Sequence, residues 1–186
     1  MNIDKEDIAN RTIYIYENID NKSISKACST ILEILRQDEK EENKLKDFTR
    51  EPIKIYIQSY GGSVYDMWAL IDLMLTSKTP IYTYCMGYAM SAGFKIFIAG
   101  SKRFIGKHAT LMYHQLNHCI WGDFKTMDEQ HFQNTLVQDD IENYVLSRTK
   151  ITKERLEEVR NTKINWYIRG NEAIELGIAD EIIEES

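Results

Sequence analysis

The stretch from Tyr82 to Gly100 constrains the fold of this chain more than any other segment. A run of β-branched and aromatic residues reaches Met86, and small residues then loosen the backbone up to Ser91. Beyond Ser91 the apolar residues recur at helical spacing, so the segment predicts a strand, a tight turn and a helix. A serine at the N-terminus of a helix either caps it or presents its hydroxyl to a cleft beside backbone N–H groups. This segment alone leaves both interpretations open.

Predicted strands and helices alternate along the chain. Each predicted strand is a short apolar or β-branched run, and each predicted helix has an apolar stripe with residues three or four apart. This alternation is typical of βαβ units on a mostly parallel sheet with right-handed crossovers. The predicted strands cover residues 11–16, 53–57, 80–86, 103–106, 110–113 and 178–183, and the predicted helices cover residues 24–35, 63–77, 91–100, 125–150, 153–160 and 171–177.

Two segments depart from this alternation. Residues 37–50 are highly charged and are predicted to form an exposed loop or a frayed helix end without chemistry. Residues 117–124 are predicted to form an exposed extended arm, and the helix over 125–150 is longer than a helix that covers one small domain. We therefore expect part of a handle region, about residues 117–150, to project from the domain.

Composition excludes several classes of protein. A length of 186 residues with 43% hydrophobic content is typical of one globular domain, residues 1–186. A net charge of -6 without a long Lys/Arg cluster argues against a nucleic-acid or membrane surface. The polar, acidic N-terminus is unlike a signal peptide, and no apolar run approaches membrane-spanning length, so we expect a cytoplasmic protein. The three cysteines lie far apart and are interpreted as small core residues.

His114 is the best candidate for a general base to Ser91. It follows the buried-looking strand over 110–113, whose packing would hold its ring, whereas the other three histidines lie in loop-like or polar helical settings. A histidine at a strand end is also often structural. A metal cluster of His114, His118 and Cys119 is another alternative, but no further ligand spacing supports it. We expect no metal and no other cofactor.

Four blocks of the sequence carry a resemblance to a known family. They occur in the family's order and at close to its spacing: Gly61-Gly-Ser-Val, Gly87-Tyr-Ala-Met-Ser-Ala-Gly-Phe, Met112-Tyr-His-Gln and Glu172-Ala-Ile-Glu-Leu-Gly-Ile-Ala-Asp. Glycine turns and helix caps are common singly, but four such blocks in register over residues 11–183 are specific. The chain resembles ClpP, the proteolytic subunit of the Clp protease. The resemblance implies an α/β fold of the ClpP/crotonase type, built from repeated ββα and βαβ units in a spiral, with a projecting handle helix.

The resemblance also implies roles for individual residues. It makes Ser91 the nucleophile and His114 the general base of a serine endopeptidase, with an oxyanion hole formed by the N–H groups of Gly62 and Ala92. The family's triad aspartate corresponds to Asn161 in this chain. Asparagine can orient an imidazole but cannot balance an imidazolium with a full negative charge, so we expect a weak or conditional peptidase.

Partners follow from the same resemblance. It implies a homo-oligomer of two stacked rings that enclose the active sites, with unfolded polypeptides or short peptides as substrates and a Clp-family AAA+ ATPase as a partner. Two other functions remain open. A structural ring subunit, weakly active or inactive and assembled with an active relative, would also account for Asn161. An acyl-CoA enzyme of the crotonase type would share the spiral fold, although Ser91 and His114 together argue against it.

Overall fold

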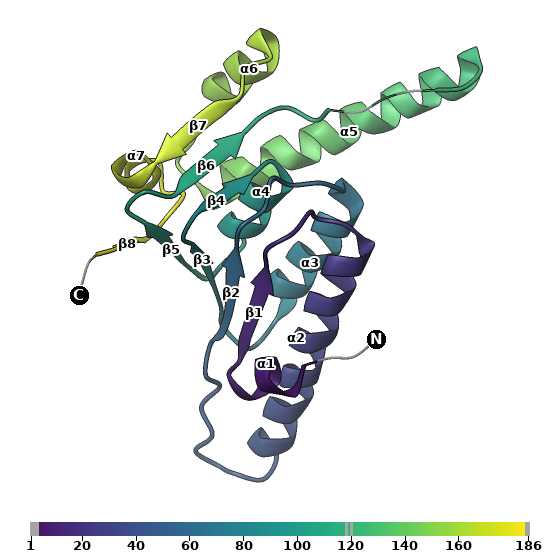
Figure 1. The fold of residues 1–186 in the computed structure, drawn as a ribbon. Coiled ribbons are helices and arrows are strands. Elements are labelled where there is room, and N and C mark those ends of the chain that lie inside the picture. Colours follow the sequence, from purple (N-terminus) through teal and green to yellow (C-terminus); the bar gives the residue numbers. More distant parts are fainter. Residues whose placement is uncertain (1–3, 118, 120, 185–186) are drawn as a thin grey trace.

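The chain forms two β-sheets with helices packed against them (Figure 1). The computed structural model describes residues 4–117, 119 and 121–184. The strands are β1 (Thr12–Ile15), β2 (Ile53–Ile57), β3 (Ile81–Cys85), β4 (Tyr88–Met90), β5 (Lys102–Gly106), β6 (Thr110–Tyr113), β7 (Trp166–Arg169) and β8 (Glu181–Ile183). The helices are α1 (Lys5–Ala9), α2 (Asn21–Glu42), α3 (Val64–Thr76), α4 (Ala92–Ile98), α5 (Phe124–Arg148), α6 (Lys153–Thr162) and α7 (Gly170–Glu175).

The larger sheet is entirely parallel. Its strand order is β1-β2-β3-β5-β8. Along the chain, α2 connects β1 to β2, α3 connects β2 to β3, and α4 precedes β5. The smaller sheet has the order β4-β6-β7, in which β4 and β6 are parallel and β6 and β7 are antiparallel. The expected α/β fold of the ClpP/crotonase type is confirmed.

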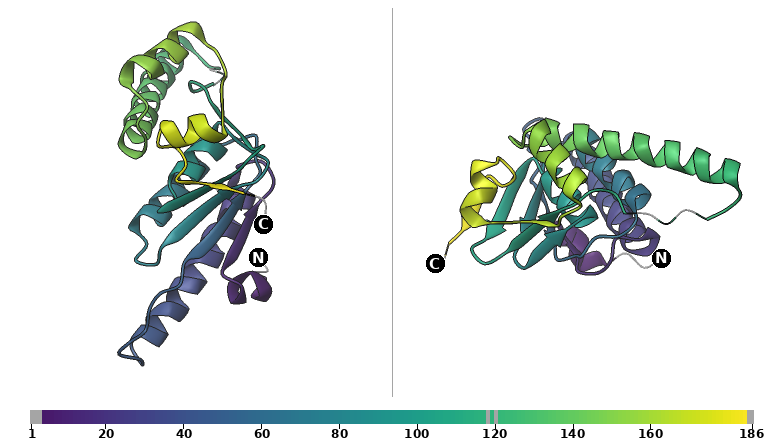
Figure 2. Two further views of the ribbon diagram at one scale, coloured as in Figure 1. Left: turned by 90° about the vertical axis from the view of Figure 1, so that its left-hand side faces the viewer. Right: turned by 90° about the horizontal axis from the view of Figure 1, so that it is seen from above.

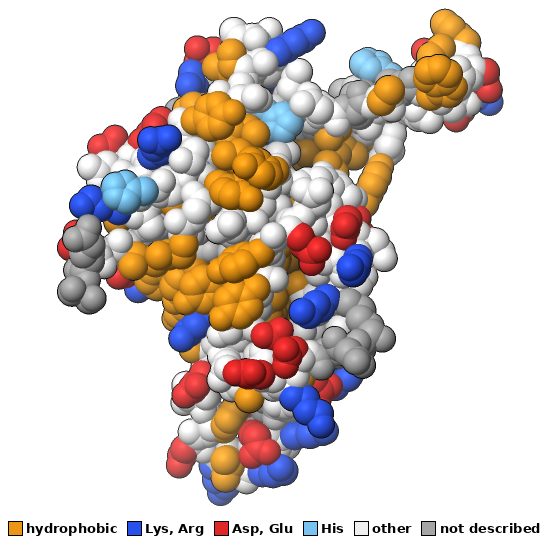
Figure 3. Space-filling model, viewed as in Figure 1, with side chains coloured by type: hydrophobic (Ala, Val, Ile, Leu, Met, Phe, Trp, Pro, Cys, Tyr) orange, Lys and Arg blue, Asp and Glu red, His pale blue; other side chains and the backbone are white. Residues whose placement is uncertain are grey.

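The two faces of the larger sheet differ, because side chains alternate along each strand. One face is packed against α2 and α3 and carries isoleucines that are at most 4% exposed: Ile13, Ile15, Ile53, Ile55 and Ile57. The other face carries a row of rings in register, with centroids 4.6 to 5.6 Å apart: Tyr14, Tyr56, Tyr84 and Phe104. This row lies in the hydrophobic patch near the centre of Figure 3. Parallel sheets are usually covered on both faces, so the single chain leaves an apolar surface open here.

Helix α5 is the projecting element that the sequence predicts (Figures 1 and 2). Its C-terminal half packs on the domain through Ile141, Tyr144 and Val145, which are at most 9% exposed. Its N-terminal half extends away from the sheets, and Phe132 is 65% exposed there. The prediction of an extended arm before α5 falls partly on His118 and Ile120, which lie outside the described residues.

The charged segment over 37–50 corrects one expectation. Helix α2 continues through its first part and ends only at Glu42, and residues 43–52 form the loop to β2. Asp38 is buried, because its carboxylate accepts hydrogen bonds from Arg11 at 2.8 and 2.9 Å and from the Thr79 hydroxyl at 2.7 Å. The expected helix end and exposed loop are therefore confirmed for most of the segment, but Asp38 is an exception, because the sequence pattern shows charge and not pairing.

Other elements are shorter than predicted or absent from the prediction. The predicted strand over 178–183 is paired only from residue 181, and the predicted helix over 171–177 ends at residue 175. The sequence pattern does not predict α1, β4 or β7. Strand β4 is only three residues long, too short for an alternating pattern to show, yet it positions Ser91.

Candidate active site

Ser91 stands at the junction between β4 and α4. Its backbone has φ 53° and ψ -116°, a conformation that residues with a Cβ rarely adopt and that costs roughly 1–3 kcal/mol. Gly61 allows this turn to pack closely, since a Cβ on Gly61 would lie 2.7 Å from the Ser91 Cβ. The serine side chain makes no capping hydrogen bond, so the structure does not support the interpretation of Ser91 as a helix cap.

The smaller sheet brings His114 to Ser91. Strand β6 pairs with β4 so that Met112 is opposite Met90, and the Ser91 N–H donates to the Met112 carbonyl at 2.9 Å. His114 follows β6 directly, and its Nε2 lies 2.7 Å from the Ser91 Oγ. This distance is a hydrogen bond between a hydroxyl and the ring nitrogen of a base, the contact that nucleophilic catalysis by serine requires.

The surroundings of His114 favour its neutral form. Burial first, and then the positive charge of Lys95, lower the pKa of His114 from 6.5 to about 4. The ring is therefore neutral at pH 7 and can accept a proton. Its weak basicity limits how strongly it activates the serine, because general-base catalysis works best with a pKa near the working pH.

Two backbone N–H groups beside Ser91 are candidates for an oxyanion hole. The Gly61 carbonyl accepts from the Ile19 N–H at 2.8 Å and the Ser63 N–H donates to the Ile19 carbonyl at 2.7 Å, a pattern that leaves the Gly62 N–H out of the pairing. Ala92 is the first residue of α4, where N–H groups lack partners within the helix. The Gly61 turn lies against Ala92, since a Cβ on Gly61 would be 2.9 Å from the Ala92 nitrogen. The loop that carries Gly62 therefore packs, through Gly61, against the junction of Ser91 and Ala92.

A different asparagine from the predicted one contacts the far nitrogen of His114. Asn117 Nδ2 lies 3.2 Å from His114 Nδ1, whereas Asn161 is exposed near the end of α6 and makes no hydrogen bond to His114 in the described part of the chain. The Asn117 amide can present either its NH₂ group or its oxygen to Nδ1. With the amide oxygen turned toward Nδ1, the ring carries its proton on Nδ1 and leaves Nε2 free to accept from Ser91. The structure therefore does not bring Asn161 to the site, and its orienting role stays a prediction.

Lys95 is a residue of this site that sequence reasoning missed. It is 4% exposed on α4, and burial lowers its pKa from 10.5 to about 7. Its Nζ lies 4.9 Å from the centroid of the Tyr113 ring, and its carbonyl accepts a hydrogen bond from the Tyr144 hydroxyl at 3.1 Å. The signal in the sequence is a lysine inside a seven-residue helix, Ala-Gly-Phe-Lys-Ile-Phe-Ile, that is otherwise apolar or small.

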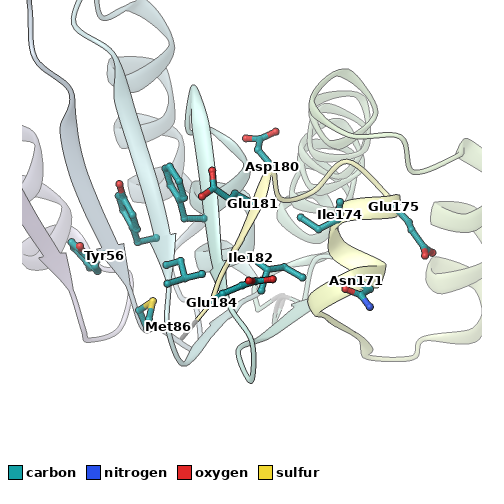
Figure 4. Close-up of a pocket in the computed structure, with 12 residues that line it drawn as sticks. Tyr56, Met86, Asn171, Ile174, Glu175, Asp180, Glu181, Ile182 and Glu184 are labelled. Carbon is teal, nitrogen blue, oxygen red and sulfur yellow. The ribbon is translucent and has the colours of Figure 1, made fainter. Parts of the chain in front are cut away.

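Two cavities differ in their volume and in the residues that line them. A small cavity of about 80 Å³ lies beside Ser91 and His114 and is lined by Lys95 and by side chains of α3 and α5. A much larger one, about 1080 Å³, lies between the ring-bearing face of the larger sheet, β8 and α7 (Figure 4). Its described lining contains Tyr56, Met86 and Asn171 but neither Ser91 nor His114. Ser91 and His114 therefore open to the smaller cavity.

The described residues do not support a metal site. No group of three or more His, Cys, Asp or Glu side chains in residues 4–117, 119 and 121–184 is arranged to hold a metal ion. Of the alternative cluster, His114 is engaged with Ser91, Cys119 is exposed, and His118 lies outside the described residues. In the same described ranges, no helix combines the length and the apolar character that crossing a membrane requires.

Comparison with known proteins agrees with the fold. The sequence model of the Clp protease family matches residues 2–186. The chain is 28% identical over 138 residues to an ATP-dependent Clp protease proteolytic subunit of Deinococcus radiodurans, covering 73% of this chain and 67% of the relative. It is 34% identical over 135 residues to proteolytic subunit 1 of Prochlorococcus marinus strain NATL2A, covering 70% and 66%. It is 33% identical over 139 residues to proteolytic subunit 4 of Rhodococcus jostii strain RHA1, covering 74% and 71%.

These matches span about two thirds of the length of the curated relatives. The family match covers nearly the whole chain, including the turn at Gly61, the Ser91 junction and His114. With an α/β fold, a projecting α5 and a serine–histidine contact at 2.7 Å, the chain belongs to the Clp protease family.

Proposed function

We propose that this protein is a serine endopeptidase that cleaves unfolded polypeptides or short peptides through an acyl-enzyme. The hydrogen bond of 2.7 Å between Ser91 Oγ and His114 Nε2, at a strained strand-to-helix turn, carries the proposal. Family membership adds support, because the relatives that the chain matches are described as proteolytic subunits of ATP-dependent Clp proteases.

The reaction follows from the contacts at this turn. As Ser91 Oγ attacks the peptide carbonyl carbon, its proton moves to His114 Nε2 and the carbonyl oxygen becomes an oxyanion. The N–H groups of Gly62 and Ala92 stabilise the negative charge. His114 then passes the proton to the departing amine nitrogen, which breaks the C–N bond and leaves an acyl ester on Ser91. A water molecule that is deprotonated by the same ring releases the acid product.

The expected rate is low for this class of enzyme. In serine proteases, replacing the triad aspartate with asparagine lowers turnover about 10⁴-fold. No Asp or Glu among the described residues forms an ion pair with His114 at 4.0 Å or less, and the pKa of the ring is lowered to about 4. We therefore propose a weak or conditional peptidase, with an asparagine as the orienting group.

Labelling by a fluorophosphonate probe tests the nucleophile. The purified oligomer should take up the probe at Ser91, and Ser91→Ala should abolish both labelling and peptide hydrolysis. Ser29→Ala, which removes a hydroxyl from α2, is the matched control and should leave both unchanged. Absence of labelling in the wild type, or hydrolysis that survives Ser91→Ala, would refute the proposal.

Assembly into stacked rings is the second part of the proposal. Apolar side chains are exposed along the arm and the projecting half of α5, including Trp121 at 89%, Phe124 at 77% and Phe132 at 65%. Exposed apolar groups of this size on one element favour a partner surface. We propose that α5 packs against a second ring of the same chain and that the active sites face an enclosed chamber. A Clp-family AAA+ ATPase would then supply unfolded substrate.

A structural ring subunit without activity of its own is the alternative function. The low pKa of His114 and the absence of a nearby carboxylate in the described residues favour it. Asn161→Asp and Asn117→Asp each add an acid at one of the two candidate orienting positions. Activity that appears with either variant would indicate that His114 is a poorly oriented or too weak base in the wild type. No activity and no probe labelling in any form would favour the structural role.

A further inference from the structure

Lys95 places a buried amine next to the nucleophile. It lies four residues after Ser91, so both occupy the same side of the first turn of α4. Its side chain lines the 80 Å³ cavity together with Ser91 and His114, and it is 4% exposed. Lysine is almost never this buried unless an acid pairs with it.

Within the described chain, no acid pairs with Lys95. No described Asp or Glu oxygen lies within 4.0 Å of its Nζ, and its ring neighbour is Tyr113 at 4.9 Å. Glu142 is the buried acid of the adjacent part of α5, but its carboxylate is already engaged. Its Oε1 accepts from Gln138 Nε2 at 2.7 Å and lies 3.3 Å from an Arg160 nitrogen. The amine of Lys95 is therefore available to a ligand in the cavity, and an anion there favours its protonated form.

The cavity walls restrict what that ligand can be. Val64, Met67 and Ile141 give it apolar wall segments, Gln115 and Asn117 add side-chain amides, and Lys95 adds an amine that is a cation when protonated. In a partly buried site an unpaired cation favours an anion over a neutral group. The volume of about 80 Å³ compares with about 30 Å³ for one water molecule, so the cavity suits a short side chain rather than an aromatic one.

We propose that this cavity binds the side chain of the residue whose carbonyl carbon Ser91 attacks, and that Lys95 selects aspartate or glutamate there. The inference rests on the proposed peptidase function and names its substrate class. The methylene groups of an acidic side chain would contact the apolar wall segments, and its carboxylate would pair with Lys95 Nζ. Lys95 would act by binding and not by taking the serine proton, because His114 already holds Ser91 Oγ at 2.7 Å.

Matched substrates test this inference in the intact oligomer. The substrates are fluorogenic peptides identical except at the residue before the cleaved bond, which is Asp, Glu, Asn, Gln or Leu. For wild-type protein, kcat/KM should be at least tenfold higher for Glu than for Gln and for Asp than for Asn. In Lys95→Met this ratio should fall to about one or below. Lys40→Met, which removes an exposed lysine of α2, is the control and should keep the wild-type ratio.

The other outcomes each contradict the inference. Equal cleavage of Glu and Gln peptides by the wild type, or a preference for Leu over both acids, would overturn it whether or not Lys95→Met folds. An equal loss of all five substrates in Lys95→Met would assign Lys95 to the proton transfer or to folding instead of selection. Phosphonate probes with Glu or Gln at the same position extend the comparison to slow enzyme, since labelling needs only one turnover. Labelling by a simple fluorophosphonate without acid selectivity refutes this inference alone, whereas no labelling by any probe refutes the peptidase function and this inference with it.

Discussion

Replacing Lys95 with methionine should stabilise the protein at neutral and acidic pH, and the gain should vanish in alkaline solution. The pKa of Lys95 is lowered by burial from 10.5 to about 7. Between these two values the unfolded chain binds a proton at this residue that the folded chain does not. Stability rises with pH wherever the unfolded state binds more protons. The lysine therefore destabilises the fold fully below pH 7, and this cost is recovered as the pH rises to 10.5.

The size of the effect follows from the same difference. At 1.36 kcal/mol per pKa unit, a fall from 10.5 to about 7 corresponds to about 5 kcal/mol. Methionine has a similar length and no charge, and volume-conserving changes in a core usually cost less than about 1.5 kcal/mol. Below pH 7, Lys95→Met should thus exceed the wild type in free energy of unfolding by roughly 3–5 kcal/mol. Near pH 10.5 only the packing difference should remain.

Urea unfolding of both proteins over a pH series measures this difference. The protomer concentration must be the same throughout, because assembly makes apparent stability depend on it. The titratable groups near Lys95 are not shifted into the range between pH 7 and 10.5. The pKa of His114 is lowered to about 4, and burial raises the pKa values of Tyr113 and Tyr144. Lys40→Met is the control and should give a difference that is flat with pH. A flat difference for Lys95→Met as well, or a loss of stability at pH 6, would refute the reasoning.

The site makes three further predictions. Because the pKa of His114 is lowered to about 4, kcat/KM should stay constant from neutral pH to about pH 5 and halve near pH 4. Lys95→Met should move this acid limb of the pH profile to higher pH. An acid limb near pH 6.5 in the wild type would contradict the burial of the ring. Asn117→Ala should lower kcat roughly tenfold or more and shift the pH profile, with little change in KM. A larger loss of kcat with the matched Asn161→Ala would assign the orienting role to Asn161 instead. Phe132→Glu should convert stacked rings into smaller species in native mass spectrometry, and an unchanged mass would exclude this part of α5 from the ring contact.

The sequence predicts the parts of the site that depend on local geometry. Ser91 follows from a turn of small residues between a strand and a helix, and His114 follows from a strand end. Strand pairing then brings them together, and the order of the blocks in the chain is enough to anticipate that pairing. The parts that depend on packing were not predictable. Lys95 lies in a helix whose other residues, apolar or small, are sufficient to predict its packing. Nothing in their spacing shows that position 95 faces a cavity.

The orienting residue shows the same limit. Matching positions with the family assigns Asn161, but the contact with His114 Nδ1 is made by Asn117, only three residues along the chain. Such a contact depends on how the segment after β6 turns back, which residue type and spacing do not determine. Asp38 is the structural counterpart: a charged run predicts exposure, whereas pairing with Arg11 and Thr79 buries it. The sequence gives the type of each side chain, whereas its contact partners depend on tertiary packing.

The lysine and the missing aspartate are connected through His114. A positive charge near the ring lowers its pKa, and no negative charge in the described site compensates for it. If an acidic substrate pairs with Lys95, its carboxylate cancels that charge, so the pKa of His114 should rise in the complex and the ring should become a better base. The acid limb of kcat reports the enzyme–substrate complex, and that of kcat/KM reports the free enzyme. For a Glu substrate the kcat limb should therefore lie at higher pH than the kcat/KM limb, and for the matched Gln substrate the two should coincide. Limbs that coincide for both substrates would show that the substrate carboxylate does not act on His114.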